Sequence, residues 1–190
     1  MAKSKNNIVM QGTSGAIGDM LVFRQVAGQT VISRRPKKPM GDPSLAQQEV
    51  RDRFREAAFY TKNIVNDPLQ YEVYASKALP GQSAFNMAFK DYMKPPVIKE
   101  SNISATGYTG AVGSQIRVRA IDDFKVISVT VTLTDTNGSV LESGEAEQSA
   151  NGIDWLYTAT VENASLPGTR ITVKAHDRPG NIGQAETVLA

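Results

Sequence analysis

Two adjacent prolines, Pro95 and Pro96, divide the chain into two stretches with different hydrophobic periodicity. Between residues 44 and 93, apolar residues recur at the three- and four-residue spacing of helices. Beyond residue 115, apolar and polar residues alternate, which is the period of strands that bury one face. Paired prolines stop a helix and favour extended backbone. The chain is therefore predicted to be an α+β protein with two modules, residues 1–95 and residues 96–190.

The alternating half predicts an all-β sandwich of immunoglobulin type, with about seven short strands separated by turn signals. The runs that carry the alternation are Ile116 to Ala120, Val129 to Leu133, Trp155 to Val161, Ile171 to Ala175 and Thr187 to Leu189. Asn137-Gly138 is a strong signal for a hairpin turn. Trp155 shares a face with Tyr157, so we expect its side chain to be buried between the sheets. The cysteine pair of antibody domains is missing.

Three helices are predicted before the prolines. The first follows Asp42-Pro43-Ser44, which offers either an N-cap with proline in the first turn or a capping box of Ser44 with Gln47, and it extends to about residue 65. Shorter helices are expected over residues 69–78 and 83–93. The inner face of the third helix is expected to carry Phe85, Ala88, Phe89 and Tyr92.

A β-hairpin is predicted earlier, from two β-rich runs at residues 20–26 and 30–35. Its apolar residues fall on both faces, because strand side chains alternate. An isolated hairpin is at best marginally stable in water, and the sequence around this one offers no obvious sheet for it to join. We therefore expect a contact between chains, or with a partner's sheet edge, at Leu21, Phe23, Val26, Val31 and Ile32.

The glycine-rich run Gly12-Thr-Ser-Gly-Ala-Ile-Gly18 invites comparison with a dinucleotide-binding loop. That fingerprint requires the last glycines to open a helix within a βαβ unit. Here the residues that follow favour a strand and then a turn. The glycines are therefore interpreted as positions where the chain bends tightly and crosses close to another backbone.

Charge is distributed unevenly along the chain. Residues 1–99 carry 15 Lys and Arg against 8 Asp and Glu, whereas residues 100–190 carry 6 against 11. A basic arm is predicted from Lys3, Lys5, Arg34, Arg35, Lys37 and Lys38. It is either a solvated linker or a contact with an acidic protein surface or with nucleic-acid phosphates.

The composition argues against most kinds of catalytic site. The chain has no cysteine, which excludes disulfides, thiolate metal sites and cysteine nucleophiles. The one histidine, His176, lies beside an aspartate in a predicted loop, where a surface residue is the preferred interpretation over a catalytic triad. We therefore predict a protein that is not an enzyme and needs no cofactor.

No membrane contact is predicted from the sequence. No run reaches the roughly 18 apolar residues of a membrane helix. The basic N-terminus is not followed by an apolar segment, so no secretory signal is expected. We expect the protein to be cytoplasmic when it is made.

Two predicted loops contain candidate metal ligands. Asp122 and Asp123 follow one strand of the predicted sandwich, and Asp177 and Asn181 follow another. The second and sixth strands of such a sandwich run in the same direction, so the loops after them share one end. Carboxylate and amide oxygens are ligands of Ca²⁺. Aspartates that cap turns are the alternative interpretation, because the dense Asp-x-Asp-x-Asp pattern is absent.

Two resemblances add to these predictions. The run Ala175-His-Asp-Arg-Pro-Gly-Asn181 resembles the end of bacterial immunoglobulin-like domains. Residues 12–93 resemble uncharacterised small proteins of Bacteroidota bacteria and their phages, through the glycine-rich start, a hairpin that ends in Arg34-Arg-Pro-Lys-Lys-Pro39, and a Gln/Arg/Phe helix with Gln47, Arg51, Arg53 and Phe54. Ser83-Ala-Phe-Asn86 also matches that group. The second resemblance implies a mobile element or a virion as the context.

The sequence therefore predicts a non-enzymatic structural or assembly protein, associated with a virion or a mobile element. The N-terminal module would contact further copies of the chain or other assembly components, and the immunoglobulin-like domain would be displayed. One alternative is a nucleic-acid-binding protein that uses the basic arm. Another is a carbohydrate-binding module, in which Trp155 would stack on sugars.

Overall fold

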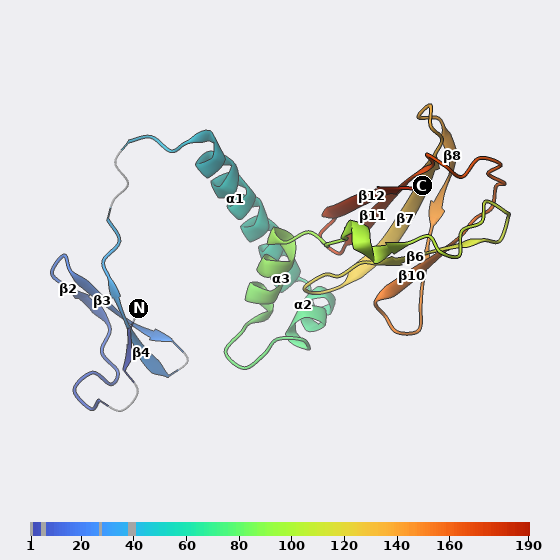
Figure 1. The fold of residues 1–190 in the computed structure, drawn as a ribbon. Coiled ribbons are helices and arrows are strands. Elements are labelled where there is room, and N and C mark those ends of the chain that lie inside the picture. The colour runs from blue at the N-terminus through green and yellow to red at the C-terminus, as the bar shows by residue number, and fades with distance from the viewer. Residues whose placement is uncertain (1, 5–6, 27, 38–40) are drawn as a thin grey trace. The chain divides into compact units, whose positions relative to one another are not determined.

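The computed structural model describes residues 2–4, 7–26, 28–37 and 41–190. Within these residues the chain forms three α-helices and three antiparallel sheets of four strands each (Figure 1), which confirms the predicted α+β class. The chain separates into two compact units, Met1–Arg51 with Leu79–Gly81, and Asp52–Ala78 with Gln82–Ala190. The division lies inside helix α1 (Leu45–Asn66), so most of the helical residues belong to the same unit as the C-terminal strands.

The first unit contains a small sheet with the strand order β1-β4-β3-β2. The predicted hairpin is present as β3 (Leu21–Val26) and β4 (Gln29–Arg34). Its two edges are paired by β1 (Ala2–Ser4) and β2 (Gly15–Ile17). The expectation that the hairpin has no sheet to join is therefore wrong, because the N-terminus and the glycine-rich run each supply a flanking strand.

The glycines of this run allow the bends around β2. Gly12, Gly15 and Gly18 have φ angles of 79°, 116° and 53°, a region that side chains with a Cβ rarely adopt. A turn and then β3 follow, and no helix opens after the glycines. The predicted tight bending is confirmed, but the predicted close approach to another backbone is wrong, because a Cβ added at any of these three glycines would meet no atom of the described chain within 4 Å.

The three helices lie close to their predicted positions. Helix α1 begins after the Ser44–Gln47 capping box, in which the Gln47 amide donates to Ser44 Oγ and the Ser44 amide donates to Gln47 Oε1. Helix α2 (Pro68–Ala75) has proline at its first position, and Asp67 accepts two backbone N–H groups there. Helix α3 (Ala84–Met93) begins at Ser83, whose side chain accepts from the Asn86 amide.

The buried face of α3 agrees with the prediction at Ala88 and differs from it elsewhere. Ala84, Ala88 and Asp91 are buried on α3, whereas Phe85 is exposed. The small alanines pack against Ile64 of α1 and Tyr74 of α2. The larger rings pack on one another instead, since Phe89 lies 4.5 Å from Phe54 between ring centroids. Close helix packing thus selects the small side chains for the interior.

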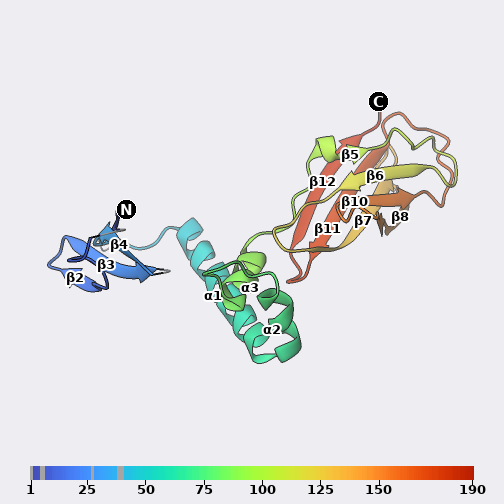
Figure 2. The ribbon, with the colours of Figure 1, turned by 90° about the horizontal axis from the view of Figure 1, so that it is seen from below.

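The C-terminal strands form two sheets around one core (Figures 1 and 2), with the strand orders β5-β6-β10-β9 and β12-β11-β7-β8. Their strands, after the short helix η1 (Glu100–Asn102), are β5 (Ile103–Ser104), β6 (Gln115–Arg119), β7 (Val126–Thr134), β8 (Val140–Glu145), β9 (Glu147–Gln148), β10 (Asp154–Thr158), β11 (Arg170–Asp177) and β12 (Ile182–Val188). Trp155 is 5% exposed within this core, which confirms its predicted burial. Its ring face is therefore not available to stack on a sugar.

The segment after the paired prolines is held against this sandwich. Val97 and Ile121 form a two-way backbone bridge, with N···O distances of 2.8 and 3.1 Å. Gly183 of β12 lies very close to the backbone of Pro96. A Cβ added at Gly183 would be 2.0 Å from the Pro96 carbonyl oxygen. Glycine at residue 183 is therefore required by this close approach.

Gly183→Ala should lower the free energy of unfolding by about 1–3 kcal/mol, because the Pro96 backbone must shift to admit the methyl group. Urea denaturation followed by circular dichroism measures the change. The control is Gln184→Ala at the next, exposed position, which should change stability by about 0.5 kcal/mol or less. Equal midpoints for Gly183→Ala and the parent would mean that the close approach is absent.

Candidate functional site

The predicted assembly residues are divided between the two faces of the N-terminal sheet. Phe23 pairs with Ile32 across the hairpin, and strand alternation places Leu21 on the same face. Val26 and Val31 lie on the opposite face. Phe23 and Val31 are 6% and 8% exposed, each buried on its own face of the sheet, whereas Leu21 and Val26 are exposed and Ile32 is half-buried.

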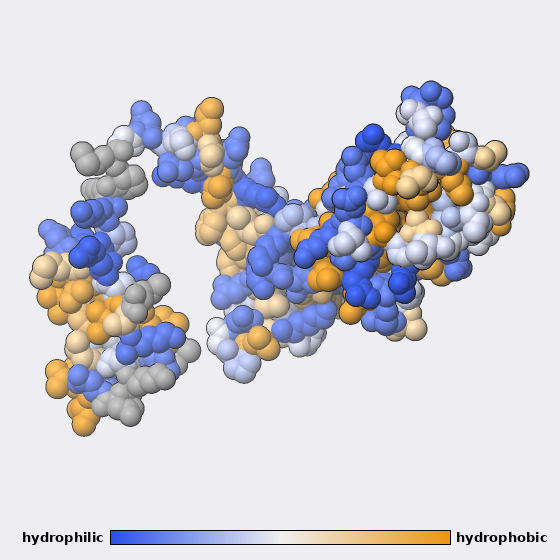
Figure 3. Space-filling model, viewed as in Figure 1, coloured by the Kyte–Doolittle hydropathy of each residue, from blue (hydrophilic) through white to orange (hydrophobic). Residues whose placement is uncertain are grey.

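The connection between β1 and β2 lies over the face of the sheet that carries Phe23. Thr30 and Gln25 share that face with Phe23, and their side chains donate to the carbonyl oxygens of Met10 and Thr13 at 2.8 and 2.7 Å. The remaining surface of this unit is apolar in many places (Figure 3). The large apolar side chains exposed in and beside the sheet are Ile8, Val9, Ile17, Met20, Leu21 and Val26.

The basic arm does not form one surface. Lys3 pairs across strands with Val31, whereas Arg34 lies three residues further along β4 and so on the opposite face. Arg35 forms an ion pair with Asp19. Lys37 is exposed, and Lys5 and Lys38 lie outside the described residues.

A second candidate site lies where α2 and α3 meet the loops at one end of the sandwich, a region that we call the junction. Asn181 connects its two sides. Its side-chain amide donates to the backbone carbonyl oxygens of Asp91 and Tyr92 at 3.3 and 3.1 Å, and to Asp177 Oδ2 at 2.7 Å. Its backbone amide donates to Asp177 Oδ1 at 2.6 Å. The amide of Asn181 therefore ties the end of α3 to the loop after β11.

Three carboxylates converge at the junction. Asp91, Asp122 and Asp177 each offer an oxygen, and these three atoms lie within 4.8 Å of one another. Asp91 is 1% exposed, and Tyr74 donates to its Oδ2 at 2.6 Å. Asp122 Oδ2 accepts the backbone amides of Phe124 and Lys125, both at 2.8 Å. Among the described residues, neither Asp91 Oδ1 nor Asp122 Oδ1 has a hydrogen-bond partner, and both atoms are buried.

This cluster disfavours full ionisation. Two unit charges about 4.8 Å apart repel by roughly 3–4 kcal/mol at an effective dielectric constant of about 20. Burial, with the charges of Asp122 and Asp177, raises the pKa of Asp91 to about 7, although the Tyr74 hydrogen bond and the charge of Arg178 lower it. Burial also raises the pKa of Asp177, against the hydrogen bonds from Asn181.

The predicted metal ligands are thus only partly brought together. Asp122 and Asp177 meet, as expected for loops at one end of the sandwich, and each also caps its own turn. Asp123 points elsewhere and forms ion pairs with Lys94 and Lys90 at 2.8 and 3.1 Å, and these lower its pKa. Asn181 positions Asp177 through its amide hydrogens.

Asp91 was missed because the predicted inner face of the third helix was centred on its aromatic residues, of which Phe89 and Tyr92 are only half-buried and Phe85 is exposed. The usable signal is the spacing of Ala84, Ala88 and Asp91, which places an acidic residue on the stripe of small side chains. An acidic residue on such a stripe is expected to be buried, and a buried carboxylate needs hydrogen-bond donors or cations around it.

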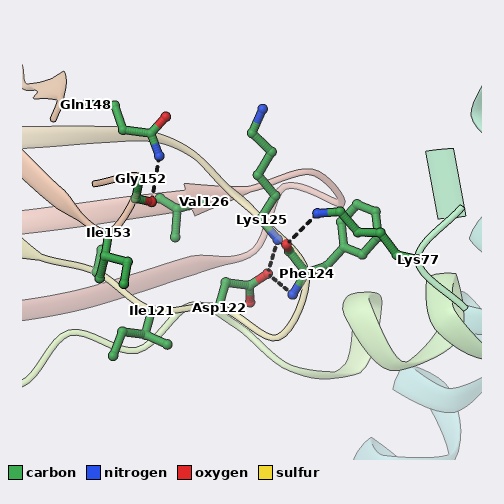
Figure 4. A pocket seen from close by; sticks show the side chains of 10 residues that line it. Lys77, Ile121, Asp122, Phe124, Lys125, Val126, Gln148, Gly152 and Ile153 are labelled. Atoms are coloured by element: carbon green, nitrogen blue, oxygen red, sulfur yellow. Dashed lines mark hydrogen bonds between the residues drawn. The ribbon is translucent and has the colours of Figure 1, made fainter. Parts of the chain in front are cut away.

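A pocket of about 420 Å³ reaches Asp122 from one side (Figure 4). Lys77 lies at its rim, donates to the Phe124 carbonyl oxygen at 3.3 Å, and sits 4.4 Å from the centroid of the Phe124 ring. The Phe124 ring in turn stacks on Tyr74, with centroids 4.4 Å apart. Asp177 lines a second pocket, together with residues of α1 and α2. Two of the three carboxylates thus each line a different pocket.

Comparisons with known proteins identify no family for this chain. No protein-family model matches the chain, and no curated protein matches it. Among solved structures, an engineered protein matches 58% of this chain and 29% of its own, with 18% identity and a TM-score of 0.32. A tetra-tandem repeat from the extending region of a large adhesion protein matches 50% of this chain and 24% of its own, with 21% identity and a TM-score of 0.32. The chain thus spans less than a third of each solved chain, and similarity at this level supports no functional statement.

No helix in the described part of the chain is both long enough and apolar enough to span a membrane.

Tyr74→Phe should lower the free energy of unfolding by about 1–3 kcal/mol, because the buried Asp91 loses its hydroxyl donor. Tyr60, whose hydroxyl lies 3.0 Å from that of Tyr74, loses a partner as well. Urea denaturation measures the effect, and the exposed Tyr71 on the same helix gives the control Tyr71→Phe. Equal losses in the two variants would show that the Tyr74–Asp91 hydrogen bond contributes no stability.

Proposed function

We propose that this chain is a non-enzymatic structural protein that assembles with further copies of itself through its N-terminal sheet. The observation that carries the proposal is the imbalance between the interior and the surface of that sheet. Among its described residues, Phe23 and Val31 are the large apolar side chains that are buried, while six others are exposed. A four-stranded sheet with so small an interior is marginal on its own, and a second copy would supply the missing apolar cover.

The edges of the sheet also support strand pairing between copies. β1 and β2 are the outer strands, and each has only three residues. Their outer backbone groups are not paired with another strand of the described chain, so they offer a template for strand addition. Ile17 of β2 is exposed beside that edge.

The second part of the proposal is that the C-terminal sandwich is an immunoglobulin-like domain displayed by the assembly. Its support is the strand order. Lettered in sequence as A, B, C, C′, D, E, F and G, the eight strands β5 to β12 pair as A-B-E-D and G-F-C-C′. This is the arrangement of the immunoglobulin fold, with C′ added to the C-F-G sheet.

The resemblance of residues 12–93 to small proteins of Bacteroidota and their phages supports a virion or mobile-element context for such an assembly. In that case the protein would be made in the cytoplasm and would then join a particle. Neither part of the proposal requires a cofactor.

Ile17→Lys and Val26→Lys should each weaken self-association at least tenfold while leaving the circular dichroism spectrum unchanged. Both positions are exposed in the monomer, so a lysine there is tolerated in the fold but carries charge into an apolar contact. Sedimentation equilibrium at several protein concentrations measures the association constant. Val31 is unsuitable for this test, because it is buried within the sheet.

The matched control is Val188→Lys on β12, since Val188 and Val26 are 54% and 55% exposed. It should associate like the parent. A parent that is monomeric at all concentrations, or lysine variants that associate as strongly as the parent, would refute the proposal. Association that weakens steeply between about 50 and 200 mM salt would instead favour contacts with phosphate groups, as in the nucleic-acid alternative.

A further inference from the structure

We propose that Asp91, Asp122 and Asp177 bind a divalent cation, Ca²⁺ in the first instance, which links helix α3 to the sandwich. This inference is independent of the assembly proposed for the N-terminal sheet. It rests on the geometry of the junction and on the buried carboxylate oxygens that have no partner there.

The spacing of the three carboxylates fits a shared ion. Ca²⁺ binds oxygen ligands at about 2.3–2.6 Å, so two ligands on opposite sides of the ion lie about 4.6–5.2 Å apart. One oxygen from each of the three aspartates lies within 4.8 Å of the others. An ion placed among the three oxygens would lie within about 2.8 Å of each, which is close to the Ca²⁺–oxygen distance.

The independent observation is the orphaned oxygen of Asp91. This side chain is 1% exposed, and within the described chain its Oδ1 accepts no hydrogen bond. Asp122 Oδ1, from a different loop, is buried and unpartnered in the same way. Native proteins rarely leave such acceptors unsatisfied, because an unpaired buried oxygen loses its hydration without replacement. A cation between these carboxylates would satisfy both oxygens together.

Within the described chain, the positively charged side chains near the cluster do not bind its three carboxylates directly. Arg178 is the cation that acts on Asp91, and its guanidinium is held by Gln70 Oε1 and lies 5.9 Å from the Tyr74 ring centroid. Lys90 and Lys94 are paired with Asp123. A divalent ion would add positive charge at the point where the charges of Asp122 and Asp177 act on Asp91.

The donor atoms indicate the kind of metal. The cluster offers carboxylate oxygens and no thiolate, which suits a hard cation such as Ca²⁺ or Mg²⁺ more than a soft transition metal. Ca²⁺ also tolerates irregular geometry and additional water ligands, as expected where the ligands come from one helix and two loops. Asp122 also lines a pocket, which brings solvent to one side of its carboxylate group.

Bound at this point, the ion would hold together segments that are distant in the sequence. Asp91 belongs to α3, Asp122 to the β6–β7 loop and Asp177 to the end of β11. Asn181, in the loop between β11 and β12, already joins that loop to α3 by hydrogen bonds. The ion would add a second link and make the orientation of α3 on the sandwich dependent on Ca²⁺.

The test uses the full chain after treatment with a chelator. Calorimetric titration with CaCl₂ should give one site per chain. The unfolding temperature should rise by about 5–10 °C at a Ca²⁺ concentration about 100 times the dissociation constant. Asp91→Asn, Asp122→Asn and Asp177→Asn should each abolish both responses. MgCl₂, with its stricter octahedral requirement, should give a smaller shift.

Two comparisons separate metal binding from a purely structural role. Asp123→Asn removes the same charge from the same loop but lies outside the cluster, so it should keep the full response to Ca²⁺. Asp91→Asn in chelator should unfold at or above the temperature of the parent, because it removes a like charge from the cluster. A structural role alone would lower the stability of Asp91→Asn with and without Ca²⁺.

Three results would overturn the proposal. The first is the absence of calorimetric binding to the parent. The second is an equal rise in unfolding temperature with NaCl at matched ionic strength, which would indicate charge screening. The third is a full Ca²⁺ response in Asp91→Asn and Asp177→Asn, with both variants folded by circular dichroism.

Discussion

The amide of Asn181 is the contact on which the arrangement of the C-terminal unit depends. It donates to two carbonyl oxygens at the end of α3 and to Asp177 of the loop that contains it. Buried carbonyl oxygens need such donors, because they no longer accept hydrogen bonds from water. The same bonds bring the carboxylates of Asp177 and Asp91 close together. The acidic cluster is thus a consequence of how the helix is attached to the sandwich.

Buried carboxylates are costly, and their retention at a packed junction needs a physical reason. Tyr74 supplies one donor to Asp91, and backbone amides supply donors to one oxygen of Asp122. Two oxygens remain unsatisfied among the described residues, and burial raises the pKa of Asp91. The cation proposed above would reduce the repulsion and give the unpaired oxygens a partner, whereas a proton on Asp91 would reduce the repulsion and could donate a hydrogen bond to one neighbouring carboxylate only.

The N-terminal sheet has a different physical problem. Its strands are short, and Phe23 and Val31 supply most of its buried apolar surface. Pairing by β1 and β2 satisfies the hairpin's backbone but cannot create an interior, because a single sheet has two faces and little to cover them. The exposed apolar residues of this unit therefore favour a partner surface, for which a second copy is the simplest source.

The period of the apolar residues was enough to predict the helices, the alternating strands and the burial of Trp155, because side-chain periodicity follows directly from backbone geometry. The same reasoning placed Asp122 near Asp177, since loops after parallel-running strands share an end. It could not identify the flanking strands of the hairpin, as three-residue strands carry no periodic signal. It also could not place Asp91, because which side of α3 faces inward depends on how closely Tyr74 and Ile64 pack against Ala84 and Ala88. The side of α3 that faces inward is set by how the volumes of these side chains fit together, and only the tertiary structure decides it.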